Sequence, residues 1–150
     1  MNRLSQNELI GTVAIQSALE NSAEHRLSLA KAMLILPLIL DRAVRLVLKR
    51  KTSVVLSSKD LLISNPATFI TVRARYEDLT ITSLNTILLA QELGMAILEG
   101  DCLVLKKQIY HQSSSEIGKI ASDILASGPK LGLILSEATT DLYQTFRIEL

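Results

Sequence analysis

The chain has 150 residues, of which 48% are hydrophobic and 21% charged, and its formal net charge is +1. This composition is typical of a folded globular protein, and it excludes a disordered chain or one attracted to nucleic acid by a large overall charge. The single cysteine, two histidines and absent tryptophan exclude an internal disulfide and a cysteine-rich zinc site, and argue against an aromatic stacking platform. The length predicts one domain over residues 1–150.

The hydrophobic residues are not arranged as a membrane segment. The longest uninterrupted apolar run, Ala32–Leu40, is much shorter than the about 20 residues of a membrane helix. The N-terminus also lacks the apolar core of a secretory signal. We therefore expect a cytoplasmic protein that does not enter a membrane. Its mean hydropathy of +0.31 is high for a small monomer and suggests that apolar surface is buried against a partner.

Helical patterns dominate the N-terminal third. Ser5 and Glu8 form a capping box, which predicts a helix that ends near Asn21. A second helix is expected over 26–48 as the most buried element, with a kink or break just before Pro37. Its predicted core residues are Leu34, Leu36, Pro37, Leu38, Ile39 and Leu40.

The middle of the chain predicts short helices. Ser57 and Ser58 can cap a brief helix over 59–64, and Asn65 followed by Pro66 is a start signal for the next helix. The β-branched run 80–82 marks a boundary. The following helix, 82–93, carries an apolar stripe and is closed by Gly94. The stripe consists of Leu84, Ile87, Leu88 and Leu93.

A hairpin and further helices are expected after Gly94. Apolar segments on either side of Gly100 and Asp101 predict a β-hairpin near 95–107. A second capping box over 113–116 precedes a helix that should end at Gly128 and Pro129. A last helix is expected over 131–142.

The sequence offers no recognisable active site. A glycine-rich phosphate loop and a nucleophile elbow are both absent. His25 and His111 have the context of surface histidines, and Cys102 that of a buried structural thiol. We therefore expect that the protein is not an enzyme and uses no cofactor or metal.

A basic run near residue 45 has two interpretations. Arg42, Arg45 and Lys49 share one stripe of a helix, and Arg50 and Lys51 extend the run. These side chains could contact phosphates, or they could be solvated cations at the end of a helix, where the helix dipole favours positive charge. The sequence leaves both possibilities open.

The order of elements suggests a mainly α fold with one β-hairpin, similar to a winged helix. Residues 82–93 would form its last helix and residues 97–106 its wing. A helix that reads DNA carries Arg, Lys, Asn or Gln toward the groove, but this helix offers only Asn85 and Gln91. A winged-helix DNA-binding transcriptional regulator is therefore an alternative, and a protein-binding domain is favoured.

Short motifs resemble a known family, the middle component of bacterial three-component ABC systems. They are Asn7–Gly11, Leu34–Leu40 followed by Arg42 or Arg45, and Leu61–Pro66 followed by Arg73 or Arg75. The resemblance implies a non-enzymatic adaptor between an SMC/Rad50-like ABC ATPase and an effector, both encoded nearby, in a bacterial anti-phage defence system. The candidate contacts to a partner or nucleic acid are Arg42, Arg45, Lys49, Arg50, Lys51, Arg73 and Arg75.

Two expectations concern assembly. Nucleic acid should bind only weakly or through the complex. Apolar stripes near the two ends of the chain could pair two copies about a two-fold axis, which predicts a homodimer. The residues of these stripes are Leu9, Ile10 and Val13 in the first helix and Leu131, Ile134 and Leu135 in the last.

Overall fold

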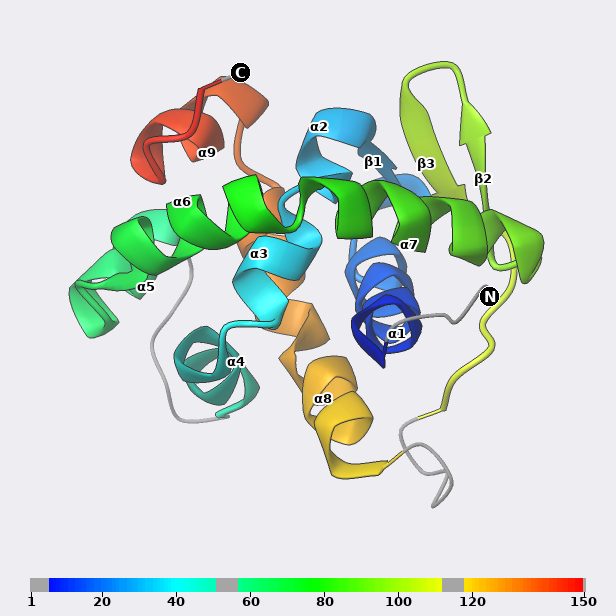
Figure 1. Cartoon of the computed structure of the whole chain (residues 1–150), viewed down its shortest axis with the longest axis horizontal. Coiled ribbons are helices and arrows are strands. Elements are labelled where there is room, and N and C mark those ends of the chain that lie inside the picture. The colour runs from blue at the N-terminus through cyan, green and yellow to red at the C-terminus, as the bar shows by residue number, and fades with distance from the viewer. Residues whose placement is uncertain (1–5, 51–56, 112–117, 150) are drawn as a thin grey trace.

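The computed structural model describes residues 6–50, 57–111 and 118–149 (Figure 1). These residues form mostly helices and a small antiparallel sheet, which confirms the predicted mainly α fold with a hairpin. The helices are Gln6–Glu20 (α1), Leu29–Ala32 (α2), Ile35–Ile39 (α3), Arg42–Lys49 (α4), Ser58–Ser64 (α5), Thr68–Asp78 (α6), Thr80–Glu92 (α7), Gly118–Leu135 (α8) and Thr139–Thr145 (α9). The strands are Arg26–Ser28 (β1), Ala96–Glu99 (β2) and Cys102–Leu105 (β3).

Helix α1 is the central element of the fold. Every residue from Gly11 to Leu19 is buried, because α1 packs against α8, α7, α3 and the sheet. Figure 1 shows α6 and α7 running end to end across the view, above α1 and α3. The predicted central segment is also deeply buried: Leu34, Leu36 and Leu38 have at most 1% exposure, Pro37 and Ile39 are buried, and Leu40 is half-buried.

Small residues let neighbouring helices approach α1 closely. A Cβ atom added to Gly132 of α8 would lie 2.4 Å from the backbone oxygen of Asn21. A Cβ atom on Gly11 of α1 would lie 2.7 Å from the Cγ2 atom of Thr86 on α7. Both distances are shorter than atoms can approach, so larger residues at these positions would push the helices apart.

The buried polar side chains of α1 bind a segment that follows the sheet. The Gln16 amide donates to the Tyr110 carbonyl at 2.7 Å, and its oxygen accepts from the backbone N–H groups of Ile109 and Tyr110 at 2.7 and 2.8 Å. The hydroxyls of Thr12 and Tyr110 are 2.8 Å apart. Because both buried side chains have partners, their burial fixes this segment against α1 without leaving unsatisfied polar atoms there.

The helix expected over 26–48 is wrong in its extent. Residues 26–28 form strand β1, and the remainder is divided among α2, α3 and α4. The break lies at Met33 and Leu34, a few residues before Pro37. Pro37 itself lies in the first turn of α3, where its missing N–H group removes no intrahelical hydrogen bond.

The hairpin is confirmed, but the sheet has a third strand that the sequence did not predict. Gly100 has a φ of +64°, which suits glycine, and the turn places Glu99 opposite Cys102. Strand β1 pairs antiparallel with β3, so the strand order is β1-β3-β2, with Leu27 opposite Leu103.

Helix boundaries in the middle of the chain agree in part. The Ser57 hydroxyl caps α5 by accepting from the Asp60 N–H at 3.2 Å, as predicted. Asn65, predicted to begin the next helix, instead ends α5, and α6 begins after Ala67. Gly94, with φ +75°, follows the end of α7 as expected.

The predicted break at Gly128 and Pro129 is wrong. Helix α8 continues through Pro129 to Leu135, because residues on both sides of the proline pack tightly on α1. The helix expected over 131–142 is therefore divided between α8 and α9. The capping box over 113–116, Ser5 of the first capping box and Ile117 lie outside the described residues.

The stripes proposed to pair two copies close the core of one chain instead. Val13, Leu131, Ile134 and Leu135 are all buried where α1 meets α8 and α9, although Leu9 is exposed and Ile10 is half-buried. Most of the stripe surface is therefore covered within one chain, which leaves little of it for a second copy, and the homodimer stays a prediction.

The first prediction concerns the buried α3 segment. Leu38→Ala should lower the free energy of unfolding by about 2–5 kcal/mol, because it removes a fully buried side chain and leaves a cavity. Ile81→Ala, at a residue with 68% exposure, should change it far less. Denaturant unfolding of both variants measures the difference, and equal losses would contradict the central position of α3.

The second prediction concerns the contact between α1 and α8. Gly132→Ala should destabilise the fold by about 1–3 kcal/mol, although alanine favours helices, because the added methyl meets the Asn21 backbone. Ser122→Ala on the same helix should change stability by less than about 0.5 kcal/mol. Thermal unfolding compares the two variants. A stabilised Gly132→Ala protein would show that the two helices do not approach this closely.

Candidate functional site

Helix α7 exposes large apolar side chains on its outer face. The predicted stripe points only partly inward: Ile87 is buried, whereas Leu84 and Leu88 are 41% and 55% exposed. Ile81, one helical turn earlier, is 68% exposed. The inward face carries mainly small or polar residues, namely Ser83, Thr86 and Ala90, along with Ile87 and Leu89. We call the exposed residues Ile81, Leu84 and Leu88 the α7 stripe.

Three of the candidate arginines, Arg42, Arg45 and Arg75, lie near Asp41. The Asp41 carboxylate caps α4 by accepting from the N–H groups of Ala43 and Val44 at 3.0 and 3.3 Å. Its other oxygen lies 3.9 Å from Nε of Arg75 on α6. The Arg45 guanidinium donates to the Ile39 carbonyl at 2.9 Å.

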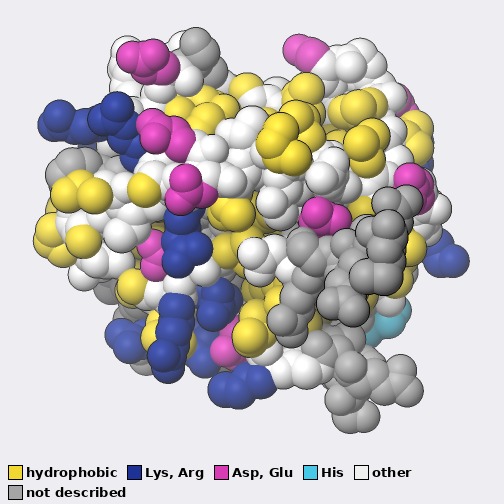
Figure 2. Space-filling view, viewed as in Figure 1, with side chains coloured by type: hydrophobic (Ala, Val, Ile, Leu, Met, Phe, Trp, Pro, Cys, Tyr) yellow, Lys and Arg dark blue, Asp and Glu magenta, His cyan; other side chains and the backbone are white. Residues whose placement is uncertain are grey.

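The electrostatics of Arg45 show how crowded this cluster is. Burial lowers the pKa of Arg45 from its usual value, Asp123 opposes that effect, and the positive charges of Arg42 and Arg75 lower it further. Arg42 is exposed and forms no ion pair within the described residues. Figure 2 shows Lys and Arg side chains gathered on the lower left of this face, below α6.

Two other cations of the predicted basic run make different contacts. Lys49 forms an ion pair with Asp123 of α8, with Nζ 3.2 Å from Oδ1. The backbone oxygen of Arg50 accepts a hydrogen bond from Lys130. Lys51 lies outside the described residues. The structure thus divides the predicted stripe into an Asp41 cluster and an α4–α8 contact.

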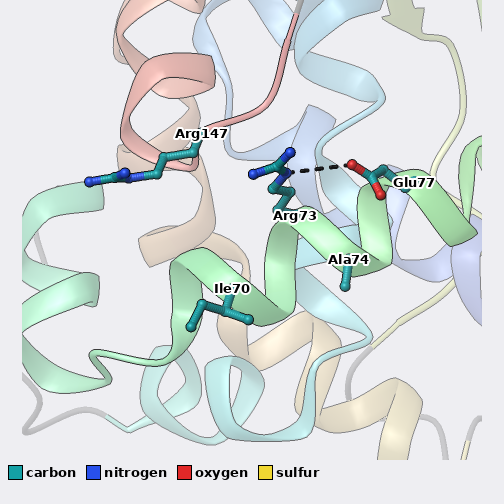
Figure 3. Close-up of a pocket in the computed structure, with 5 residues that line it drawn as sticks. All are labelled: Ile70, Arg73, Ala74, Glu77 and Arg147. Carbon is teal, nitrogen blue, oxygen red and sulfur yellow. Dashed lines mark ion pairs between the residues drawn. The ribbon is translucent and has the colours of Figure 1, made fainter.

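Arg73 lies on the outer side of α6, away from the Asp41 cluster. It borders a hollow of about 380 Å³ lined by Ile70, Arg73, Ala74, Glu77 and Arg147 (Figure 3). Arg73 Nε is 3.5 Å from Glu77 Oε1, one turn along the helix, and both side chains are exposed. We call this feature the α6 hollow. Sequence analysis missed Arg147 because nothing in the sequence predicts that the C-terminal segment lies beside α6.

Two tyrosines hold the C-terminal segment beside α6. The rings of Tyr76 and Tyr143 meet edge to face with centroids 5.8 Å apart, and the Tyr143 hydroxyl donates to the Ala30 carbonyl at 2.6 Å. Burial, with the hydrogen bond to Tyr76, raises the pKa of Tyr143 above its usual value. Tyr143 therefore stays neutral and fixes α9, and with it Arg147, against α6.

Other candidate chemistry is dispersed. His25 and His111 are exposed, as expected, whereas Cys102, expected to be buried, is only half-buried at the start of β3. Within residues 6–50, 57–111 and 118–149, no three His, Cys, Asp or Glu side chains form a group that could hold a metal ion. No helix in the same ranges is long and apolar enough to cross a membrane.

The third prediction separates the capping role of Asp41 from its charge. Asp41→Ala should lower the free energy of unfolding by about 0.5–2 kcal/mol, because α4 loses its cap. Asp41→Asn should retain most of the stability, since an asparagine oxygen caps equally well and the Arg75 contact is long and partly exposed. Equal losses in urea unfolding would show that the ion pair, not the cap, stabilises this cluster.

Comparison with known proteins identifies the family. The family model described as ABC-three component (ABC-3C) system Middle Component 3 matches residues 3–150. No curated protein and no solved structure gives a significant match to the chain. The match spans nearly the whole sequence and agrees with the resemblance seen in its motifs. The chain belongs to the Middle Component 3 family and is a middle component of an ABC-three component system.

Proposed function

We propose that this protein is a non-enzymatic adaptor that links the ABC ATPase of its three-component system to the effector component, in a bacterial defence system. The family match indicates a three-component ABC system. The α7 stripe is the observation that supports the adaptor role. Ile81, Leu84 and Leu88 share one outer helix face and are each at least 41% exposed. A protein partner that covers this face gains the free energy of burying apolar surface.

The charges of the candidate site support protein rather than nucleic-acid contact. Arg45 donates to a backbone carbonyl, Arg75 lies near Asp41, and Lys49 pairs with Asp123. Arg45, Arg75 and Lys49 therefore already contact groups of the folded chain. Phosphate binding requires cations that can neutralise the backbone, so we expect weak duplex binding by the protein alone.

A winged-helix regulator is the second candidate, favoured by one observation. The strand β1 after α1 and the hairpin after α7 form one sheet of order β1-β3-β2, with the Gly100 turn at the tip of the hairpin. The helix before the hairpin, α7, would then enter the major groove. Its outer face presents the apolar α7 stripe, which matches a protein surface better than base edges.

The fourth prediction tests the adaptor role. The protein co-expressed with the ABC ATPase and effector components of its system should co-purify with the ATPase. Leu84→Asp with Leu88→Asp should weaken this association at least tenfold, because a charge would be buried in the contact. The same change at Leu133, 45% exposed on α8, should have little effect. Failure of the wild-type chain to bind any component would contradict the adaptor role.

Two further measurements separate the competing interpretations. A second copy of the chain could cover the α7 stripe, and light scattering would then show a wild-type dimer that the paired aspartate substitutions convert to a monomer. Sub-micromolar, sequence-selective duplex binding, with affinity that falls steeply with salt, would instead favour the regulator.

A further inference from the structure

The apolar face of α7 continues along α6. The outward positions are spaced alternately four and three residues apart, an average of 3.5, which is the repeat of a helix that packs along another helix. We call this row the seam, and it consists of Ile70, Ala74, Glu77, Ile81, Leu84 and Leu88. Five of the six are apolar, and all six are exposed.

The two helices present the seam as one nearly continuous surface. Leu79 joins them with φ −103° and ψ 10°. Hydrogen bonds from Leu79 N–H to the Arg75 oxygen and from Ser83 N–H to the Leu79 oxygen, each 2.7 Å, carry the helical pattern across the joint. The opposite face is buried at Val72, Ser83 and Thr86. The seam therefore points outward along the whole length of α6 and α7, which lie end to end in Figure 1.

The α6 end of the seam is positively charged. There Ile70 and Ala74 lie in the α6 hollow with Arg73 and Arg147, and Glu77 is the acidic residue among the described residues that line it (Figure 3). Glu77 already contacts Arg73 through an exposed pair, a kind of contact that exchanges readily for another carboxylate. The hollow therefore suits an apolar side chain flanked by an acidic one.

The backbone at Arg147 has a conformation that favours glycine. Arg147 has a φ of +56° and ends α9 with hydrogen bonds to Gln144 and Tyr143, from the Arg147 and Ile148 N–H groups. The end of α7 has the same arrangement with Gly94, the residue that suits a left-handed conformation. An arginine there is less stable than glycine, and strained positions of this kind cluster at functional sites.

We infer that the seam binds one amphipathic α-helix of the ABC ATPase component, with apolar residues at 3.5-residue spacing and an acidic side chain at the end that meets Arg73 and Arg147. This inference rests on the proposed adaptor function and specifies its partner element. Seam residues recur about every 5 Å along the helix axis, which matches one turn of a second helix, whereas residues on one face of a strand recur about every 7 Å. The two arginines fix the direction in which the partner helix runs.

The fifth prediction uses substitutions at the α6 end, which the adaptor test above leaves untouched. Ile70→Ser should weaken binding to the ATPase component at least tenfold, because Ile70 is 61% exposed and lines the hollow that an apolar side chain of the partner would enter. Ile63→Ser, at a residue 78% exposed on α5 and outside the seam, is the matched control and should leave the affinity unchanged. Calorimetry on the full-length chain measures both.

Arg147→Gly separates binding from folding. It should raise or maintain the thermal unfolding midpoint, because glycine relieves the positive φ. It should nevertheless weaken ATPase binding several-fold at low salt and reduce the salt dependence of the affinity. If both Ile70→Ser and Arg147→Gly bound the ATPase component with wild-type affinity, the inference would be overturned. The adaptor function would not be contradicted by that result, because the chain would still bind the ATPase.

Cross-linking tests the helix directly. A photo-reactive residue at 70, 81 or 88 should attach to one segment of the ATPase, at sites that advance along that segment in the same or the reverse order. Such a residue at Lys59, on α5, should not reach the segment. Cross-links to a second copy of the chain, or to unrelated ATPase segments, would overturn the inference.

Discussion

The close contact of α1 with its neighbours determines how the rest of the molecule is arranged. Gly11 on α1 and Gly132 on α8 leave no space for a Cβ atom, so α7 and α8 can approach α1 from different sides. Thr86 is the residue of α7 that meets Gly11. The small side chain of Thr86 can be buried at this short separation, Ile87 and Leu89 are buried as well, and Leu84 and Leu88 lie on the outer face. The packing of the core thus produces the exposed stripe.

Local signals predicted several elements well. The Gly100 turn, the Ser57 cap and the Gly94 helix end each depend on the conformation or side-chain oxygen of one residue, which the sequence shows directly. The errors have a different origin. Strand β1 is only three residues long and forms through pairing with β3, far away in the sequence. Pro129 stays helical because tertiary packing holds both halves of α8 against α1.

The candidate site was predictable only in part. The sequence placed Arg42, Arg45 and Lys49 on one helical stripe, but it could not show that Arg75 approaches Asp41 or that Lys49 turns toward Asp123. The sequence also could not show that the α7 stripe faces outward. Leu84 and Leu88 have the spacing of core residues, and only the identity of the neighbouring helix decides which face is buried. Arg147 enters the α6 hollow because Tyr143 anchors α9.

Under the proposed function, folding and binding use different surfaces. The buried apolar residues of α1, α3 and α8 and the polar contacts of Gln16 hold the fold together, whereas the outer face of α6 and α7 contributes little to the core. The proposed adaptor needs such a surface, because a partner can cover it without disturbing the packing around α1. The surplus of aliphatic residues seen in the composition is accounted for partly by the core and partly by this face.

Hydrogen–deuterium exchange of the protein, alone and bound to the ABC ATPase component, tests this account most directly. Binding over the seam should slow amide exchange in α6 and α7, since a covered helix opens less often. Exchange in the buried α1 and α3 should change little, because these helices are already protected in the free protein. Slower exchange confined to other elements, with α6 and α7 unchanged, would contradict the central claim that this outer face binds the partner.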